Sequence, residues 1–167
     1  AHYNETHDLE LETHAGLEAQ IAAISDDIAY NNHDLEDGIR AHFFSLDELR
    51  FIPFMNEIIS HVDGNHPNLE EQRRVHEVTR RVINRMVQDV LQQTRQCVAS
   101  HSIQTVEQVR SFSEPLVGFS DEIENANTLL KQFLKERMYH HYRVNRMTSK
   151  AKRVLKELFE FFFNEPE

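Results

Sequence analysis

Three side chains near the amino end of the sequence have types and a spacing that could bind a ligand: Asp26, Tyr30 and Asp34. On an α-helix, positions i, i+4 and i+8 fall within an arc of about 80° over roughly two turns, so the three would share one face. A carboxylate suits a hard divalent cation, a tyrosine ring can pack on a sugar, and a second carboxylate can accept a hydrogen bond from a sugar hydroxyl. The spacing therefore indicates a candidate binding face.

The spacing of these three residues also fits a simpler interpretation, and taken by itself it favours the simpler one. Asp26 and its neighbour Asp27 could belong to an ordinary polar helix face whose carboxylates cap the helix or stay in water. Two features speak for a binding face. Ala19 and Ala23 are small and leave room for a ligand, and a solvated face would usually carry Lys or Arg among its acids.

A helix must position this face. Thr13 is a potential amino-terminal cap for a helix from about Ala15 to Asn32 or a little beyond, and Gly38 is expected to loosen the far end. The apolar residues of this segment fall within about 60° of one another on a helical wheel, opposite the Asp26 face, and are predicted to pack inward. They are Leu17, Ile21, Ile24, Ile28 and Leu35.

The middle of the chain also predicts helices. Ser45 with Glu48 forms a capping box, and Pro53 should kink or restart the segment through Val62. A turn over residues 63–67 follows. A long helix should then run from about Leu69 to Ala99, with one buried apolar stripe on its surface. The stripe consists of Val75, Val78, Val82, Met86 and Val90.

The carboxyl-terminal part predicts two more helices, after a short turn at 105–110. Ser120 should cap a helix that carries Ile123, Leu130, Leu134 and Met138, after a loop over residues 113–120, and a break should lie near 141–145. The last helix, about Met147 to Phe163, is predicted to face inward through Val154, Leu155, Leu158, Phe159 and Phe162. Neither strand alternation nor a repeat is evident. The sequence predicts an all-α unit of about six to eight helices spanning residues 1–167.

The charge distribution argues against nucleic acid as a partner of this segment. The formal net charge is −10, and all of it resides in residues 1–39, which hold ten acids and no Lys or Arg. These carboxylates would repel phosphates, unless a metal ion or a basic element pairs with them.

No apolar run is long enough for a membrane span, and the single cysteine, Cys97, is interpreted as a buried small residue. These features favour a cytoplasmic protein.

The segment from Leu17 to Gly38 resembles a late helix of the bacterial dGTPase family, in the HD-domain superfamily. The matched residues read LEAQIAAISDDIAYNNHDLEDG, and a weaker resemblance continues through 138–147 and Leu158-Phe159. The resemblance implies that the chain is the carboxyl-terminal portion of a helical HD-superfamily domain, incomplete, with 13–41 as its metal and substrate helix. It also implies that Asp26 is the last ligand of a His…His-Asp…Asp metal site, and that Tyr30 and Asp34 contact the deoxyribose and its 3′-hydroxyl.

The activity that the resemblance implies is hydrolysis of a deoxynucleoside triphosphate, dGTP or similar, to the deoxynucleoside and triphosphate. A divalent metal ion such as Mg or Mn would serve as cofactor, and a homo-oligomer is expected. The family's His-Asp motif, set among Gly-His-Pro residues, is absent, because His7-Asp8 and His33-Asp34 lack those surroundings. We therefore expect the chain to be inactive alone and to need an upstream part of the same protein. The alternative is a non-catalytic helical module for oligomerisation or regulation.

Other groups are weaker candidates. The histidines His2, His7 and His14 could bind a transition metal, although an unstructured leader is the simpler interpretation. The stretch 139–142, Tyr-His-His-Tyr, could line a nucleotide pocket or pack against the last helix. A group of arginines could meet a triphosphate or the acidic amino-terminal segment, although most should be solvated. They are Arg73, Arg74, Arg80, Arg81 and Arg85.

Overall fold

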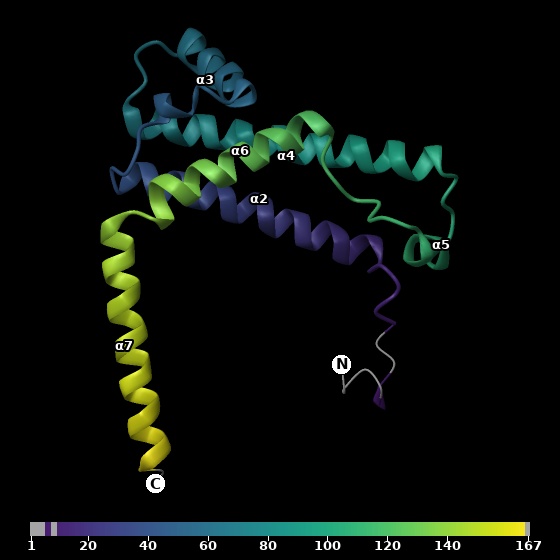
Figure 1. Cartoon of the computed structure of the whole chain (residues 1–167). Coiled ribbons are helices and arrows are strands. Elements are labelled where there is room, and N and C mark those ends of the chain that lie inside the picture. Colours follow the sequence, from purple (N-terminus) through teal and green to yellow (C-terminus); the bar gives the residue numbers. More distant parts are fainter. Residues whose placement is uncertain (1–5, 8–9, 166–167) are drawn as a thin grey trace.

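The computed structural model of the chain describes residues 6–7 and 10–165, and all regular structure within them is helical. This confirms the all-α prediction. Figure 1 shows the elements in order. They are α2 (Leu17–Arg40), the 3₁₀ helix η1 (Leu46–Leu49), α3 (Pro53–Asn65), α4 (Glu71–Ser100), α5 (Val106–Ser111), α6 (Asp121–Leu134), the short π-helical turn η2 (Lys135–Tyr139) and α7 (Tyr142–Asn164).

The core lies where α2, α3, α4 and α6 pack together, with α6 crossing in front of α2 and α4 in Figure 1. The apolar stripe predicted for the long helix is confirmed, because all five of its members are buried. From α2, Ile28 and Leu35 are buried, while Leu17 and Ile24 are partly buried against the core. Burial of such a stripe is what stabilises these helices, since most helical stability in proteins comes from packing of the apolar face.

Several helix starts follow the local chemistry of the sequence. The Ser45 backbone N–H donates to the Glu48 carboxylate at 2.8 Å, as the capping box predicts. Pro53 occupies the first turn of α3, where its missing N–H has no helical partner to lose. Ser120 caps α6, and its hydroxyl also donates to Asp89 of α4 at 2.7 Å. These three predictions are confirmed.

The predicted boundaries of α2 are wrong at both ends. Gly16, not Thr13, occupies the amino-terminal cap, and the Thr13 hydroxyl instead donates to the Glu10 carbonyl at 2.9 Å. At the other end the helix continues through Gly38 to Arg40, because Gly38 is buried against the ring of Phe44. That contact outweighs the low helix propensity of glycine.

Three further expectations need correction. Ile21 was expected to face inward but is 42% exposed. The predicted turn at 63–67 starts later, because α3 continues to Asn65, and the turn near 105–110 is the short helix α5.

The largest discrepancy is α7. It begins at Tyr142, earlier than predicted, and projects away from the other helices (Figure 1). The five residues predicted to face inward are all exposed. The periodicity identifies an apolar face correctly, but it contains no information about which surface covers that face.

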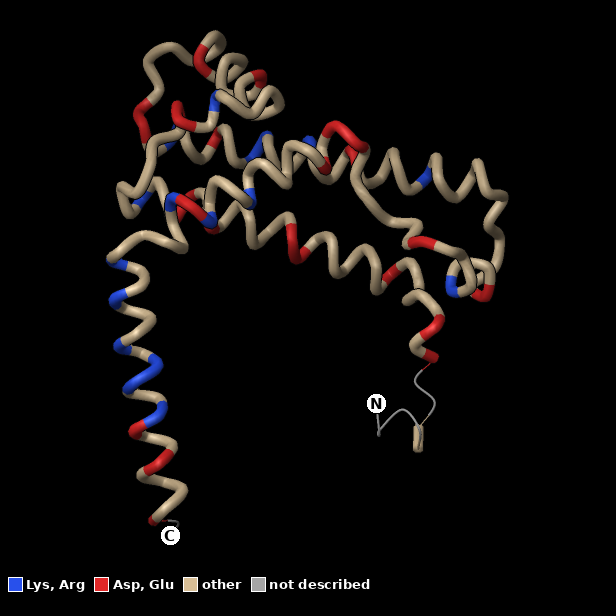
Figure 2. Tube along the Cα trace, in the orientation of Figure 1, with Lys and Arg blue, Asp and Glu red and all other residues tan. Residues whose placement is uncertain are grey.

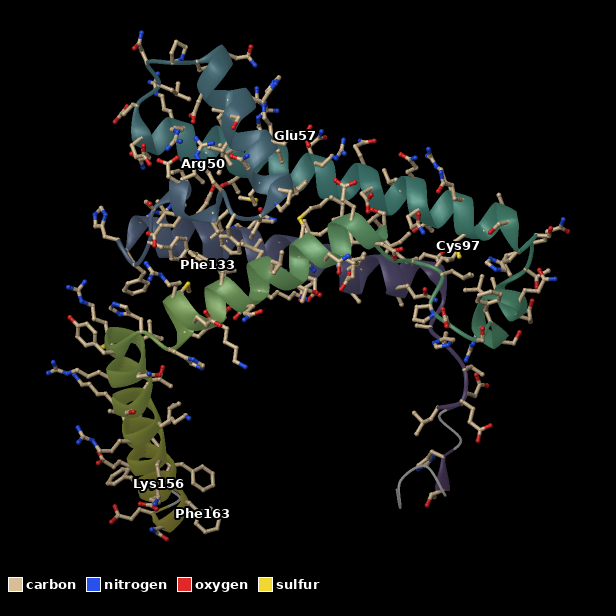
Figure 3. All side chains as sticks on the ribbon, turned by 45° about the horizontal axis from the view of Figure 1, so that its top comes forward. Arg50, Glu57, Cys97, Phe133, Lys156 and Phe163 are labelled. Atoms are coloured by element: carbon tan, nitrogen blue, oxygen red, sulfur yellow. The ribbon has the colours of Figure 1, made fainter. Side chains whose placement is uncertain are left out.

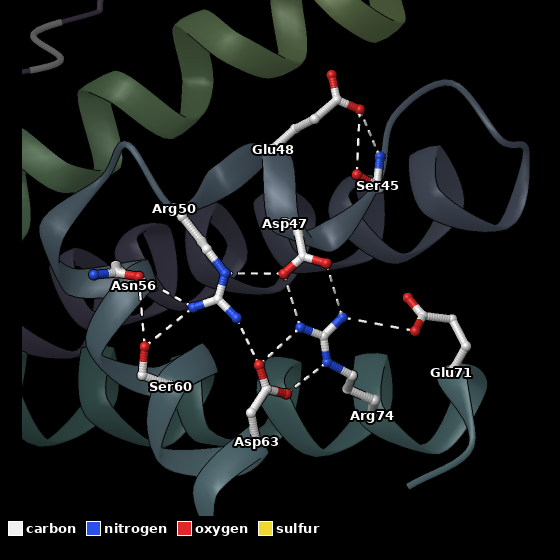
Figure 4. A network of polar contacts seen from close by, with 9 residues as sticks. All are labelled: Ser45, Asp47, Glu48, Arg50, Asn56, Ser60, Asp63, Glu71 and Arg74. Carbon is white, nitrogen blue, oxygen red and sulfur yellow. Dashed lines mark hydrogen bonds and ion pairs between the residues drawn. The ribbon is translucent and has the colours of Figure 1, made fainter. Parts of the chain in front are cut away.

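A network of two arginines and two aspartates connects η1, α3 and α4 (Figure 4). Arg74 of α4 donates to Asp63 at 2.7 Å and to Asp47 at 2.9 Å, and Arg50 bridges the same carboxylates at 2.5 and 2.9 Å. These hydrogen bonds lower the pKa of Asp47 and of Asp63, chiefly through Arg74. The network fixes the entry of α4 against the 45–63 segment.

Candidate functional site

Helix α2 carries the three residues that the sequence singles out. Asp26 and Tyr30 lie on its solvent-facing side, where 58% of Tyr30 is exposed, and Asp34 is half-buried two turns further on. The helix is continuous through all three positions, so the geometry that the spacing predicts is present. Asp26 and Tyr30 form an open face, and Asp34 lies where that face meets the end of α6.

Contacts from α6 and from the loop that precedes it hold α2 in a fixed orientation. Buried Asn31 donates from its amide to Asn127 of α6 at 3.1 Å. The side-chain oxygen of Gln20 accepts the backbone N–H groups of Leu116 and Val117 at 2.9 and 3.1 Å. These polar contacts anchor the flank of α2 that lies toward α6, so the Asp26 face is presented on a rigid element.

Asp34 has a partner that sequence reasoning did not assign to it. The Tyr139 hydroxyl, from η2, donates a hydrogen bond to the Asp34 carboxylate. Burial, followed by the contacts with Asp34 and Tyr30, raises the pKa of Tyr139 far above its ordinary value. Tyr139 is therefore a neutral donor at physiological pH, and Asp34 keeps further lone pairs for a ligand. The only signal in the sequence was the aromatic stretch at 139–142, which does not specify this pairing.

Asp26 makes no comparable contact. Within the part of the chain that the structure describes, its carboxylate forms no hydrogen bond or ion pair. Its neighbour Asp27 differs, because Lys131 of α6 pairs with it at 2.8 Å. Among the described residues no cluster of three or more His, Cys, Asp or Glu could hold a metal ion. Asp26 can thus offer one ligand, and the residues described here do not form a complete metal site.

A large groove lies elsewhere on the described chain. A groove of about 1070 Å³ runs between the carboxyl end of α2 and the start of α4, and His42, His66 and His76 are among its lining residues. The imidazole of His76 lies 3.3 Å from the Glu36 carboxylate at its edge. Asp26, Tyr30 and Asp34 line neither this groove nor the smaller cavity between α3, α4 and α6. Enclosing a nucleotide over the Asp26 face would need additional protein surface.

The weaker candidates are distributed over the structure. Of the histidine cluster, His2 lies outside the described residues, as does Asp8; His7 is exposed and His14 is half-buried. Cys97 was expected to be buried but is partly exposed, with its sulfur 3.8 Å from the ring of His101 one turn later.

Four of the five arginines singled out on α4 pair with acids near them rather than with the amino-terminal segment. Arg74 binds Asp63 and Asp47, Arg80 and Arg81 both bind Glu77, and Arg73 approaches Glu70 at 4.0 Å. The two guanidinium groups on Glu77 lower the pKa of that carboxyl to about 2. These pairs occupy much of the charge that a triphosphate would need, so the arginines are weaker anion-binding candidates than their number indicates. The acids of α2 use other partners, such as Lys131 for Asp27.

Comparisons with known proteins give a consistent result. Residues 117–167 match the phosphohydrolase-associated domain. A deoxyguanosinetriphosphate triphosphohydrolase-like protein of Parvibaculum lavamentivorans is 47% identical over 167 residues, which is 100% of this chain and 42% of the relative. Proteins of the same description from Azorhizobium caulinodans and Caulobacter vibrioides are 46% and 42% identical, over 96% and 99% of this chain and 40% and 42% of theirs. The chain thus spans about two fifths of the length of these relatives.

No helix among the described residues combines the length and the apolar content needed to cross a bilayer.

Proposed function

This chain is related over its whole length to deoxyguanosinetriphosphate triphosphohydrolase-like proteins, and we propose that it forms part of a hydrolase that cleaves a deoxynucleoside triphosphate such as dGTP to the deoxynucleoside and triphosphate. In this proposal α2 is the substrate-facing helix of the enzyme. Asp26 contributes one metal ligand, and Tyr30 and Asp34 contact the sugar. The rest of the metal site comes from residues outside those described here.

One observation carries the proposal: Asp26, Tyr30 and Asp34 lie on a single well-anchored helix, with Asp26 and Tyr30 turned away from the core. The Asp26 carboxylate is unpaired among the described residues, whereas that of its neighbour Asp27 pairs with Lys131. The absence of a counter-ion leaves Asp26 available to a divalent cation, which prefers oxygen ligands.

The sugar contacts follow from the chemistry of the other two residues. The exposed ring of Tyr30 offers a flat apolar surface on which a deoxyribose can pack, and a 2′-hydroxyl at that surface would clash or lose its hydration. Asp34 is oriented by the Tyr139 hydroxyl and can accept a hydrogen bond from a 3′-hydroxyl with its remaining lone pairs. This pair of residues would thus select deoxyribose over ribose.

The proposed metal ion is divalent, and its chemistry would be to polarise a phosphate and activate water. Among the described residues no group of three or more His, Cys, Asp or Glu side chains could hold it, and we assign one ligand, Asp26, to this chain. The chain by itself is therefore expected to bind Mg²⁺ or Mn²⁺ weakly and to show no turnover of dGTP. Turnover by the isolated chain would show that its ligand set has been misassigned.

A chimera tests the proposal directly. The matching segment of the Parvibaculum lavamentivorans protein is replaced by this chain, and dGTP hydrolysis is measured with a divalent ion, using the unmodified relative as reference. The chimera should be active. Asp26→Asn should lower its activity by two orders of magnitude or more, because even partners outside the ligand shell contribute roughly 10–100-fold to metal sites.

Asp27→Asn is the matched control, since Asp27 is the adjacent acid on the same helix and binds Lys131 instead. It should leave activity within a few fold of the chimera. Tyr30→Ala should keep metal binding but reduce the preference for dGTP over GTP. If the two aspartate variants behave alike, or if Tyr30→Ala discriminates as strongly as its parent, the assigned roles are wrong.

A second function, in a different class, is assembly or regulation by a non-catalytic helical module. The exposed apolar face of α7 favours a contact surface in the carboxyl-terminal part of the chain. The chimera separates the two, because a purely structural module would tolerate Asp26→Asn. In both cases we infer a cytoplasmic setting, on the ground that the lone cysteine makes no internal disulfide.

A further inference from the structure

Helix α7 is the one long helix of the described chain without a buried residue. It contains 23 residues, and large apolar side chains project from it into solvent. Leu155, Phe159 and Phe162 are each 67% exposed, and Phe163 is 71% exposed. In Figure 3 the side chains of Lys156 and Phe163 lie far from the other labelled side chains. An apolar surface of this kind marks an interaction site.

Five apolar residues of α7, together with Thr148, follow the spacing of a coiled coil. Positions 144, 148, 151, 155, 158 and 162 are separated by alternating steps of four and three, which keeps one seam facing a partner helix. The side chains on the seam change in size along the helix. Those of its amino-terminal half are small, and those of its carboxyl-terminal half are large: Val144, Thr148 and Ala151, then Leu155, Leu158 and Phe162.

Charge changes along α7 in the same direction. Residues 143–156 hold six cations and no acid, and residues 157–165 hold three acids and no cation. Figure 2 shows the basic half next to the body of the molecule and the acidic residues toward the free end. Arg153 and Glu157 lie 3.8 Å apart, and Lys156 and Glu160 lie 3.7 Å apart, where the two halves meet. A helix with this polarity is complementary to itself only when the second copy runs in the opposite direction.

We propose that α7 pairs antiparallel with α7 of a second copy of this chain. An antiparallel pair centred near Arg153 puts Ala151 opposite Leu155, Thr148 opposite Leu158 and Val144 opposite Phe162. Each small residue thereby meets a large one, which fills the seam evenly. The basic half of each helix lies beside the acidic end of the other. A parallel pair would set Phe162 against Phe162 and cation against cation.

This pairing has the symmetry of a closed dimer, since the same surface is used on both subunits. A lipid surface is the main alternative for a basic, Phe-rich helix. It fits less well, because the acids Glu157, Glu160 and Glu165 lie within the Phe-rich end, which an anionic bilayer would repel. The inference does not depend on the proposed hydrolase activity.

The first experiment measures the mass of the full chain in solution over the micromolar range, by sedimentation equilibrium. The chain should be dimeric. Leu155→Glu and Leu158→Glu should raise the dissociation constant by about tenfold or more each, as for central apolar residues of an interface. Val106→Glu is the control, because Val106 of α5 is 62% exposed and lies off α7. Folding of each variant is checked by circular dichroism.

The second experiment determines the direction of pairing, in a Cys97→Ser background. Thr148→Cys and Leu158→Cys chains are mixed and oxidised. The antiparallel pair predicts a disulfide between the two different chains, while each variant alone places its thiols about 15 Å apart, beyond disulfide reach. Disulfides within each variant alone would overturn the antiparallel arrangement. A monomeric chain, or one that floats with anionic vesicles instead of dimerising, would overturn the proposal altogether.

Discussion

The contact between Tyr139 and Asp34 joins η2 to the Asp26 face of α2. The phenol keeps its proton because burial and the adjacent carboxylate both disfavour the tyrosinate. Asp34 is therefore not a free surface acid, and its position is set by a second helix. If Asp34 binds a sugar hydroxyl, Tyr139 acts through it as a positioning residue.

Ionisation of Tyr139 is a testable consequence. Its raised pKa means that the folded state favours the neutral phenol, so this contribution to stability is present below the ordinary pKa of 10.0 and is lost as the pH rises toward the folded value. We expect Tyr139→Phe to remove the tyrosine that ionises at the highest pH, as followed by the ultraviolet absorbance of tyrosinate.

Tyr142→Phe is the matched control, since Tyr142 is 67% exposed. If Tyr139→Phe leaves the most alkaline component in place, the phenol is not shielded by Asp34 as described.

The network of Arg50, Arg74, Asp47 and Asp63 gives a prediction about stability at acid pH. Arg74 holds the pKa of Asp63 and of Asp47 below the ordinary value of 3.8. Their contribution to stability is therefore present above that value and is lost as the pH falls through the lowered folded values. Arg74→Leu should lower the free energy of unfolding at neutral pH by about 2 kcal/mol.

The dependence on pH distinguishes this effect from a simple loss of packing. The difference in unfolding free energy between the parent and Arg74→Leu should shrink as denaturant titrations move from neutral pH toward pH 3. Arg73→Leu serves as control, because Arg73 is exposed and only approaches Glu70 at 4.0 Å. A penalty for Arg74→Leu that is the same at every pH would contradict the electrostatic origin.

At the scale of elements, the continuity of α2 through Gly38 is decisive for the position of its last two turns. A Cβ atom added at Gly38 would lie 2.5 Å from Cζ of Phe44, which is buried. We expect Gly38→Ala to destabilise the fold by about 1–3 kcal/mol through overpacking, even though alanine favours helix by about 1 kcal/mol. Denaturant unfolding measures the change.

Gly64 in α3 offers the opposite case. A Cβ atom there would meet nothing within 4 Å, and the glycine is exposed in the last turn of its helix. Gly64→Ala should therefore stabilise the protein by up to about 1 kcal/mol. Equal effects of the two substitutions would show that the Phe44 contact does not decide the outcome.

The sequence predicted those features of the fold that are determined by residues close together in the chain. The stripe of α4, from Val75 to Val90, and the cap at Ser120 follow from spacing and hydrogen bonding within a few residues, and both are confirmed. The end of α2 depended on Phe44, which folds back from beyond the helix, so the rule that glycine loosens a helix failed. The apolar face of α7 was identified correctly, yet no pattern within one chain specifies its partner.

The same distinction between local and long-range determinants applies to the candidate site. The spacing of Asp26, Tyr30 and Asp34 along one helix was sufficient to predict their shared face. The contact of Tyr139 with Asp34 joins residues 105 positions apart in the sequence, and periodicity cannot reveal it. The roles of the three residues in binding metal and sugar stay predictions that the chimera tests.

At the scale of the whole molecule, the Asp26 face of α2 and the seam of α7 differ in what would complete them. Among the described residues no group of three or more metal-ligating side chains includes Asp26, so the proposed metal site requires residues from elsewhere in the protein. In the proposed antiparallel pair the seam of α7 is complementary to itself in size and charge, so a second copy of the same chain would cover it. Under the two proposals, the first surface needs further residues of the protein, while the second is completed by symmetry.

This difference yields a prediction about stability. Since α7 contributes no buried residue to the core, a chain ending at Arg146 should unfold at the same denaturant concentration as the monomeric variant Leu155→Glu combined with Leu158→Glu. The parent chain should be more stable than both, and its midpoint should rise with protein concentration, because dimerisation stabilises the native state by mass action. A parent midpoint that is independent of concentration and equal to that of the truncated chain would mean that α7 has no partner in solution.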